Sequence, residues 1–362
     1  MAYSSSVNSI RKLKRRREPV ALRDLAKLAG VDISTVSRAL NRDPRVNDER
    51  AEHIRKLADK VGYRPRPLRS KSTRSIGLLM GTSRLDRLDT DFCVRLSWEA
   101  ERVLAARQMH VNFECVRRDG PVVLPAIVQQ NRVDGVLLAG HPPADLVAQI
   151  RALSIPAVAI NDLVSRLQID CVRSNPEPAL KETMLHLAAR GHEAFGLIMG
   201  DTSYPTVKAR LHSYGASLSE LGIVPKPGWL VTELPAEITG GREGIRQLQQ
   251  RGPLPTTILC ENDWFALGAM QELQLQGIRI PEDVSLVGHD DLWVCQQMHP
   301  NLTTVHRAEE ELVSKAIDLL LAQVENGIGE PREVLVEGKM VWRQSTGPAP
   351  IRLKAQRDDA KS

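Results

Sequence analysis

The sequence holds few aromatic residues and no dense group of cysteines. Phe, Trp and Tyr together make up 4% of the 362 residues, so a ligand site in this protein has few rings for stacking. The cysteines are widely spaced and form no CxxC pair, which argues against a disulfide framework or a zinc module and is typical of a reducing compartment. They are Cys93, Cys115, Cys171, Cys260 and Cys295.

Long apolar runs and export signals are also missing. No apolar segment approaches the roughly 18 residues that a membrane span needs. The basic N-terminus leads into no apolar core of a signal peptide. We therefore expect a protein of the cytoplasm with no membrane partner.

The common catalytic and cofactor motifs are absent as well. The sequence contains no phosphate-binding P-loop, no G-x-S-x-G nucleophile elbow, no G-x-G-x-x-G dinucleotide fingerprint and no H-E-x-x-H metal helix. The nine histidines show no spacing typical of metal ligands. We therefore expect no enzyme activity, no cofactor and no metal.

Positive charge, by contrast, is abundant and unevenly distributed. Residues 1–75 hold 20 Lys and Arg against 8 Asp and Glu, a net charge of +12, and the remaining residues hold 29 against 36, a net charge of −7. A basic head on an acidic body is typical of a nucleic-acid-binding module joined to a second domain. A solvated basic tail is the alternative, but residues 11–17 supply only six of these positive charges, which leaves the rest of the head at +6.

The head has the pattern of three short helices. Apolar residues recur at helical spacing over 22–29, and Gly30 can end that helix in a positive-φ conformation. Asp32 is suited to cap a second helix. Asn47 is suited to cap a third, whose apolar stripe continues to Val61. Three helices with a tight turn between the first two predict a helix-turn-helix domain.

The second of these helices would enter the major groove of DNA. Ile33 is suited to contact a thymine methyl group, and Arg38 can donate two hydrogen bonds to guanine. The alternative for Arg38 is a contact to phosphate. Together with the segment that follows the head, the predicted DNA-contacting residues are Ile33, Ser34, Thr35, Ser37, Arg38, Asn41, Tyr63, Arg64, Arg66 and Leu68.

The body alternates short apolar runs with helical patterns, which is typical of parallel sheets covered by helices on both faces. The number of repeats exceeds a comfortable single sheet, so we expect two sheets with a cleft between them. The predicted strands are 76–80, 111–116, 134–140, 156–160, 194–199, 229–233, 256–260 and 284–288, and the predicted helices include 91–107, 176–190, 206–221, 262–276 and 308–325.

Polar residues follow several of these strands, where ligands bind in open α/β sheets. Asp162 follows one strand, Asn262 and Asp263 follow a second, and Asp290 follows a third. Asp and Asn also cap helices routinely. We expect Asp263 to be a cap, and Asn262 and Asp290 to contact a ligand.

Longer motifs connect the head and the body to one family. The head contains LRDLAKLAGV, STVSRALN and GYRP, and the body contains KARLHSYGASLSELGI, PTTILCENDWFALGAMQEL and GIRIPEDVSLVGHDDL. With these motifs the chain resembles the LacI/GalR family of bacterial transcriptional regulators over nearly its whole length after the basic tail. The resemblance implies a homodimer that binds a near-palindromic double-stranded DNA operator. It also implies a small effector, by family default a sugar, in the cleft of a domain similar to periplasmic sugar-binding proteins.

Matched residue by residue, the family's effector contacts fall on Lys208 or Arg210, Asn262 and Asp290. The aromatic residue that stacks on the ligand in several relatives has no counterpart near Leu234. Trp293 either replaces it or packs in the core. With Asp162 added from its position after a strand, the predicted effector residues are Asp162, Lys208, Arg210, Asn262, Asp290 and Trp293.

The chain departs from the family pattern at two places. The linker 66–75 is about one helical turn shorter than usual and has no leucine after Leu68. We expect a basic tether that contacts phosphates and bends the operator less than is usual, although Pro67 is also suited to begin a helix. His289 replaces the usual Phe or Tyr, so it either makes effector binding sensitive to pH or stays neutral.

Two other functions compete with an effector-gated repressor. An exported solute-binding protein is opposed by the head and by the missing signal peptide. A DNA-binding regulator of the same fold with no small effector stays open. The predicted fold is α/β with a small all-α head: a basic disordered arm (1–19), a helix-turn-helix domain (20–65), a basic linker with a shortened hinge (66–75), a two-lobed doubly wound effector-binding and dimerisation domain (76–346) and a C-terminal tail without leucine heptads (347–362).

Overall fold

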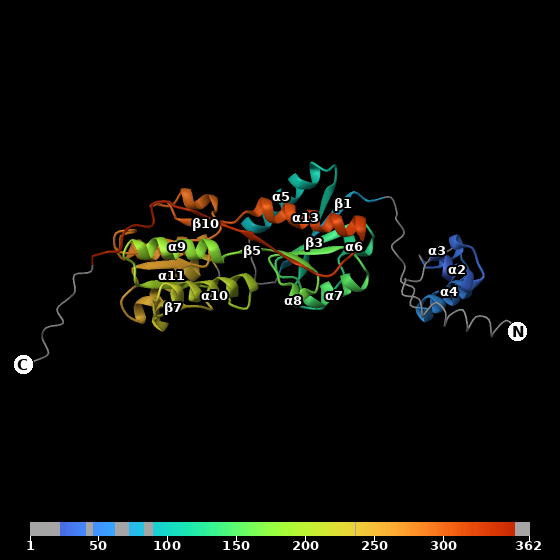
Figure 1. Cartoon of the computed structure of the whole chain (residues 1–362), viewed down its shortest axis with the longest axis horizontal. Helices are drawn as coiled ribbons and strands as arrows, with labels where there is room; N and C mark the ends of the chain where they lie inside the picture. The colour runs from blue at the N-terminus through green and yellow to red at the C-terminus, as the bar shows by residue number, and fades with distance from the viewer. Residues whose placement is uncertain (1–21, 41–45, 62–71, 83–89, 236, 352–362) are drawn as a thin grey trace, which may run out of the picture. The chain divides into compact units, whose positions relative to one another are not determined.

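The computed structural model describes residues 22–40, 46–61, 72–82, 90–235 and 237–351. The chain divides into two compact units, Met1–Ser72 and Thr73–Ser362 (Figure 1). Three of the residues that the sequence analysis assigned to the linker, 73–75, belong to the second unit. The backbone N–H groups of Thr73 and Arg74 donate to the carboxylate of Asp134, at 2.8 and 3.0 Å.

The first unit is a bundle of three helices, as predicted: α2 (Leu22–Ala29), α3 (Ile33–Leu40) and α4 (Asp48–Val61). Leu25, Val36 and Ile54, one from each helix, are fully buried and form the centre of a small core. Gly30 has a φ of +64° in the turn between α2 and α3, which explains why glycine ends the first helix. The Asn47 side chain accepts a hydrogen bond from the Glu49 N–H at 2.9 Å and so caps α4.

The second unit contains two lobes, each built around a parallel sheet, which confirms the prediction of two sheets. The first lobe has a six-stranded sheet with the order β11-β5-β4-β3-β1-β2. Its strands are β1 (Ser75–Thr82), β2 (His110–Arg117), β3 (Gly135–Ala139), β4 (Ala157–Ile160), β5 (Asp170–Asn175) and β11 (Glu333–Glu337), and its helices are α5 (Thr90–Ala105), α6 (Ala126–Gln129), α7 (Ala144–Ala152), α8 (Val164–Leu167) and α13 (Glu309–Asn326).

Helices cover both faces of this sheet (Figure 1). Alternate residues of β1 separate two cores: Leu78 packs with α5 and α13, and Leu79 packs on the opposite face with α7. A strand that is buried on both faces is apolar almost throughout, which is why the run in β1 was readable from sequence.

The second lobe has a four-stranded sheet with the order β7-β6-β8-β9 and a separate antiparallel pair, β10-β12. Its strands are β6 (Phe195–Ile198), β7 (Leu230–Val231), β8 (Thr257–Cys260), β9 (Ser285–Val287), β10 (Thr304–His306) and β12 (Lys339–Val341). Its helices are α9 (Glu177–Ala189), α10 (Pro205–Glu220), α11 (Glu237–Gln250) and α12 (Asp263–Leu275), with single 3₁₀ turns at Pro227–Trp229 and Trp293–Gln296.

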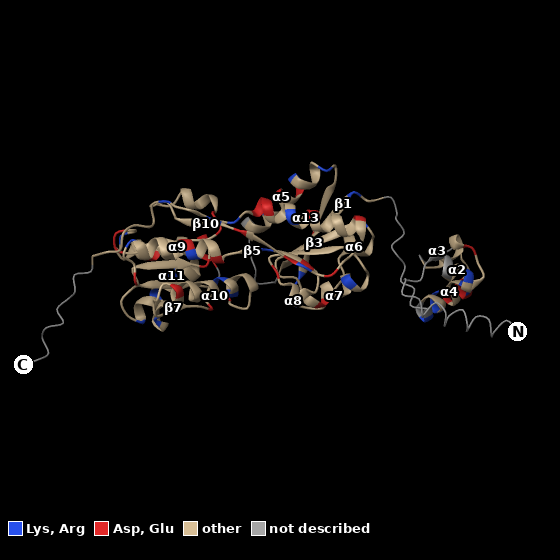
Figure 2. Ribbon diagram, viewed as in Figure 1, with Lys and Arg blue, Asp and Glu red and all other residues tan. Residues whose placement is uncertain are grey.

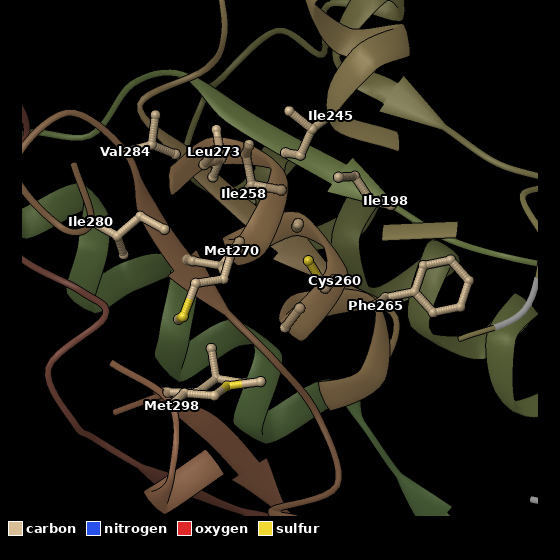
Figure 3. Packing of buried hydrophobic residues seen from close by; sticks show 14 of the residues in the cluster. Ile198, Ile245, Ile258, Cys260, Phe265, Met270, Leu273, Ile280, Val284 and Met298 are labelled. Carbon is tan, nitrogen blue, oxygen red and sulfur yellow. The ribbon is translucent and has the colours of Figure 1, made fainter. Parts of the chain in front are cut away.

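Helices α11 and α12 pack closely on one face of this sheet, where Ile245, Ile258 and Phe265 belong to one buried apolar cluster (Figure 3). A Cβ atom added at Gly241 would lie 1.9 Å from the Phe265 carbonyl oxygen, and one at Gly268 would lie 2.0 Å from the Ile238 carbonyl oxygen. Glycine is therefore required at this helix crossing, because any side chain would separate the two backbones.

All eight predicted strands are present, but the sequence analysis did not name β5, β10, β11 and β12, or the helices α6, α7, α8 and α11. Among the missed strands, β10 and β12 have three residues each, β11 lies at a sheet edge, and β5 ends in the polar residues Arg173, Ser174 and Asn175. Helix α11 contains three glycines, which have a poor helix propensity in isolation. Their role is visible only in the packing against α12.

The end of the described chain is bonded to the second lobe. The predicted tail begins at Gly347, whose N–H donates to Ser285 Oγ at 3.1 Å, and the Ala349 N–H donates to the Arg190 carbonyl at 3.0 Å. Within the described residues, no helix combines the length and the apolar character that crossing a bilayer requires.

Candidate nucleic-acid interface and interlobe junction

Helix α3 presents a polar face away from the core of the head. Its apolar residues Val36 and Ala39 are buried, whereas Ser34 and Arg38 are exposed and Ile33 is 50% exposed. The first turn of α3 therefore offers an apolar contact and a hydroxyl group, and the second offers a guanidinium group. This is the combination that reads base edges in a major groove.

Of the remaining predicted DNA-contacting side chains, only that of Thr35 lies within the described residues. Thr35 is half-buried on α3. The side chain of Ser37 and the residues Asn41, Tyr63, Arg64, Arg66 and Leu68 lie outside the described residues, as does the shortened hinge. These assignments stay predictions.

The second candidate site lies at the junction of the two lobes, where β8 and β9 end. Glu261 and Asn262 follow β8, and His289 and Asp290 follow β9. A small cavity of about 30 Å³ adjoins these strand ends, which is room for little more than water. Its lining consists of Pro176, Leu180, Thr183, Leu197, Met199, Arg210, Leu259, Cys260, Glu261, Val287, Gly288, His289 and Val305.

The prediction that Asp263 caps α12 is wrong, because Asn262 is the capping residue. The Asn262 side chain caps α12 by accepting a hydrogen bond from the Phe265 N–H at 3.0 Å. Asp263, the predicted cap, is fully buried and accepts from Thr304 Oγ1 at 2.6 Å and from the Leu292 N–H at 2.8 Å. Asp263 therefore fastens β10 and the segment after β9 to α12.

Two carboxyl groups near the cavity have raised pKa values because they are buried. Burial and the neighbouring Asp290 carboxylate raise the pKa of Asp263 to about 7. Burial also raises the pKa of Glu261, although the Arg210 charge and the Gly200 N–H act in the opposite direction. Burial at the junction therefore favours the protonated form of both carboxyl groups.

His289 is neutral in this environment. Burial, together with the charges of Arg210 and Arg307, places its pKa well below the ordinary value. The structure therefore favours the neutral histidine over a pH-sensitive one.

Asp290 has an unusual backbone and a buried carboxylate. Its φ is +117°, a conformation that residues with a side chain rarely adopt. The carboxylate oxygen Oδ1 lies 3.3 Å from Arg307 Nε, but no hydrogen bond satisfies it. The same residue accepts a hydrogen bond at its carbonyl oxygen from Arg95 Nη2 of the first lobe, at 3.1 Å.

A second group of side chains joins the lobes at the ends of β2 and β3. Arg118 Nη1 donates to the Tyr204 hydroxyl at 2.6 Å, and the guanidinium carbon of Arg118 lies 5.2 Å from the centroid of the Tyr204 ring. The His141 ring packs against the same tyrosine at 5.5 Å. Tyr204 precedes α10 of the second lobe, and thus bridges to two residues of the first.

The remaining predicted effector residues differ in their suitability. Arg210 lines the cavity and donates to the Glu261 carbonyl, whereas Lys208 is exposed on the same helix. Asp162 is fully buried, and its two oxygens are already engaged by Arg166. Trp293 is 68% exposed, in a 3₁₀ turn, and does not line the cavity.

Sequence reasoning did not single out five residues that the junction brings together: Arg95, Arg118, Tyr204, Arg307 and Glu309. The four charged residues among them carry no sequence motif that separates them from the many other charged residues of the chain. Glu261 was also missed, although its position directly before Asn262 at a strand end offered a signal. No group of His, Cys, Asp or Glu within the described residues is arranged to hold a metal ion.

Two family profiles match this chain. That of the bacterial regulatory proteins, lacI family, matches residues 21–66, and that of a periplasmic binding protein-like domain matches residues 184–346. The first covers the three-helix unit, and the second covers most of the second lobe.

Relatives align along almost the whole chain. The ribose operon repressor of Haemophilus influenzae is 28% identical over 330 residues, which is 90% of this chain and 98% of the relative. The HTH-type transcriptional repressor PurR of Aliivibrio salmonicida is 26% identical over 333 residues, with the same coverage.

A solved structure is similar to this chain over almost its whole length. The lac repressor dimer bound to operator and the anti-inducer ONPF matches with a TM-score of 0.67 and 25% identity, over 91% of this chain and 99% of that one. With a helix-turn-helix unit in front of a two-lobed periplasmic-binding-protein-like domain, this chain belongs to the lacI family of bacterial regulatory proteins.

Proposed function

We propose that this protein is a sequence-specific transcriptional repressor whose affinity for its operator is set by a small effector at the interlobe junction. The observation that carries the first part is the polar outer face of α3, with Arg38 exposed beside a rigid core. A homodimer places two copies of α3 in successive major grooves, as expected for a near-palindromic operator.

The junction supplies the second part of the proposal. Asp290 offers a buried carboxylate oxygen without a hydrogen bond, and the amide of Asn262 keeps its N–H groups for a ligand after its oxygen has capped α12. Hydroxyl groups both donate and accept, so a polyhydroxylated molecule such as a sugar suits these partners. The effector acts by binding one interlobe arrangement more tightly than the other.

The test of DNA recognition is a selection of duplexes from a random pool with the full-length protein. The wild type is expected to enrich one near-palindromic sequence. Arg38→Ala should relax the choice at one position in each half-site, at a cost of about 1–3 kcal/mol. Lys56→Ala, which removes a positive charge from α4, is the control and should leave the enriched sequence unchanged. If wild type and Arg38→Ala enrich the same positions equally, base reading by Arg38 is excluded.

A regulator of the same fold without an effector is the second candidate, and one observation favours it. The cavity at the strand ends holds about 30 Å³, and hydrogen bonds from Arg95 to Asp290 and from Arg118 to Tyr204 already bridge the two lobes. Thermal-shift measurements against sugars, nucleobases and their phosphates distinguish the two functions. A stabilising compound whose effect disappears in Asp290→Asn supports the effector, and a complete lack of response supports a scaffold.

We assign no catalytic step to this protein and place it in the cytoplasm, bound to the nucleoid. Regulation by binding needs only a difference in affinity between two states. The arginines and carboxylates at the junction are accordingly assigned to binding and to holding the lobes together.

A further inference from the structure

One arginine joins helix α5 of the first lobe to the segment after β9 in the second. Arg95 Nη2 donates to the Asp290 carbonyl oxygen at 3.1 Å, and the same atom lies 2.6 Å from Glu309 Oε1. Glu309 begins α13, whose first turn carries three glutamates (Figure 2). Arg95 therefore contacts a backbone carbonyl of the second lobe, that of Asp290, and a carboxylate at the start of α13, that of Glu309.

The contacts of Arg95 continue into a buried chain of charges. Glu309 Oε1 also accepts from Arg307 Nε at 3.2 Å, and Arg307 Nε lies 3.3 Å from Asp290 Oδ1. Arg307, Glu309 and Asp290 are each less than 10% exposed. The Arg307 guanidinium group also lies 4.9 Å from the ring centroid of Phe92 on α5. Two side chains of α5 in the first lobe thus contact this region: Arg95 contacts Asp290 directly, and Phe92 contacts its neighbour Arg307.

The backbone of Asp290 explains why such support is needed. A φ of +117° is strained for an aspartate, and strain of this kind persists only where the surroundings hold it. Within the second lobe, the Asp290 N–H donates to the Val305 carbonyl at 2.9 Å. The carbonyl of the same residue is held by Arg95 from the opposite lobe. A separation of the lobes would therefore release one of the two hydrogen bonds that keep this conformation.

The bridge through Arg95 shares no residue with the bridge formed by Arg118, Tyr204 and His141. Both bridges connect the same two rigid lobes. Because rigid bodies separate as units, loss of one bridge should weaken the other even though their side chains do not meet.

We propose that Arg95 is a positioning residue for Asp290. It holds the strained backbone of Asp290, and with it the carboxylate that contacts the effector, in place, and it keeps the two lobes closed. This inference rests on the proposed function, because it takes Asp290 as an effector contact. Arg95 also connects the junction to α5, so an effector that displaces this contact changes the packing of that helix.

The test is hydrogen exchange of the full-length protein, without DNA or effector. In Arg95→Ala, amides near Tyr204, which Arg95 does not contact, should exchange about tenfold faster, because the variant loses a hydrogen bond from a charged group. Arg102→Ala is the matched control. Arg102 lies on the same helix and pairs with Glu99 and Glu310, both of the first lobe, so its loss should leave the junction unchanged.

Two further variants keep the test decisive if Arg95→Ala folds poorly. Arg95→Lys retains the positive charge as a more strongly hydrated ammonium group, so it should keep part of both contacts and give a smaller acceleration. In Tyr204→Phe, amides at Asp290 should exchange faster in return. Normal exchange near Tyr204 in a folded Arg95 variant would overturn the proposal. That outcome is independent of DNA binding, so it is distinguishable from a failure of the proposed function.

Discussion

The head and the interlobe junction both depend on charged residues but place them in opposite environments. In the head, Arg38 and the Lys56–Glu52 ion pair are exposed to solvent. At the junction, Arg307, Glu309 and Asp290 are buried in one connected group. Salt screens exposed charges and barely affects buried ones. The head is therefore suited to reversible contact with phosphates, and the junction to holding one arrangement of the lobes.

The largest expected effect comes from breaking the buried group. Glu309→Ala leaves the guanidinium groups of Arg95 and Arg307 without their shared carboxylate, and loss of one partner of a buried ion pair costs about 3–5 kcal/mol. Chemical denaturation of the full-length protein measures the free energy of unfolding of the body. Glu311→Ala is the control, since its partner Lys315 is half-exposed and the pair should contribute at most about 1 kcal/mol. Equal losses in both variants would remove the distinction between buried and exposed pairs.

A second large effect concerns assembly, because α5 carries a charged contact to the junction and also exposed apolar side chains. Arg95 points to the junction, whereas Val94 and Trp98 are 63% and 72% exposed. We expect this apolar surface to contact a second copy of the chain, because neighbouring exposed apolar residues mark protein–protein contact sites. Trp98→Glu should shift the protein to a monomer in analytical ultracentrifugation at micromolar concentration. Val224→Glu, at a residue 81% exposed in the second lobe, should stay dimeric. A dimeric Trp98→Glu protein would contradict this assignment.

A smaller effect concerns pH, and it again separates the junction from the head. The pKa of Asp263 rises from 3.8 to about 7 on folding, so the folded protein keeps a proton that the unfolded chain releases. Its contribution to stability is therefore greatest at acidic pH and is lost as pH rises from about 4 to about 7. Asp263→Asn removes the titrating carboxyl group and keeps one acceptor oxygen for the two hydrogen bonds that Thr304 and Leu292 donate, so it should flatten this dependence. Denaturation curves at several pH values measure it, and an unchanged slope would refute the assignment.

The smallest effect is expected for the exposed pair in the head. Lys56 lies 2.8 Å from Glu52 on α4, and both side chains are largely exposed. Lys56→Ala should leave the thermal unfolding of the head unchanged at physiological salt, because surface pairs contribute little. A clear loss of stability would show that the contrast between head and junction is weaker than their burial indicates.

The sequence by itself determined the three helices of the head, the eight strands with apolar runs and the presence of two sheets. Local patterns sufficed there, because burial on both faces of a parallel sheet leaves an uninterrupted apolar run. It also placed Asp290 after a strand, whereas the family resemblance pointed to Arg210, which lines the cavity. The glycines of α11, by contrast, weakened the helical signal because their reason lies in another helix.

Only the tertiary structure decided which polar residues work together at the junction. Asn262 and Asp263 are neighbours with similar capping propensities, and their roles depend on Thr304 and Leu292, which are distant in sequence. Arg95 and Asp290 are likewise 195 residues apart. The free energy of a buried charge depends on its partners in space, so a local pattern cannot carry that information.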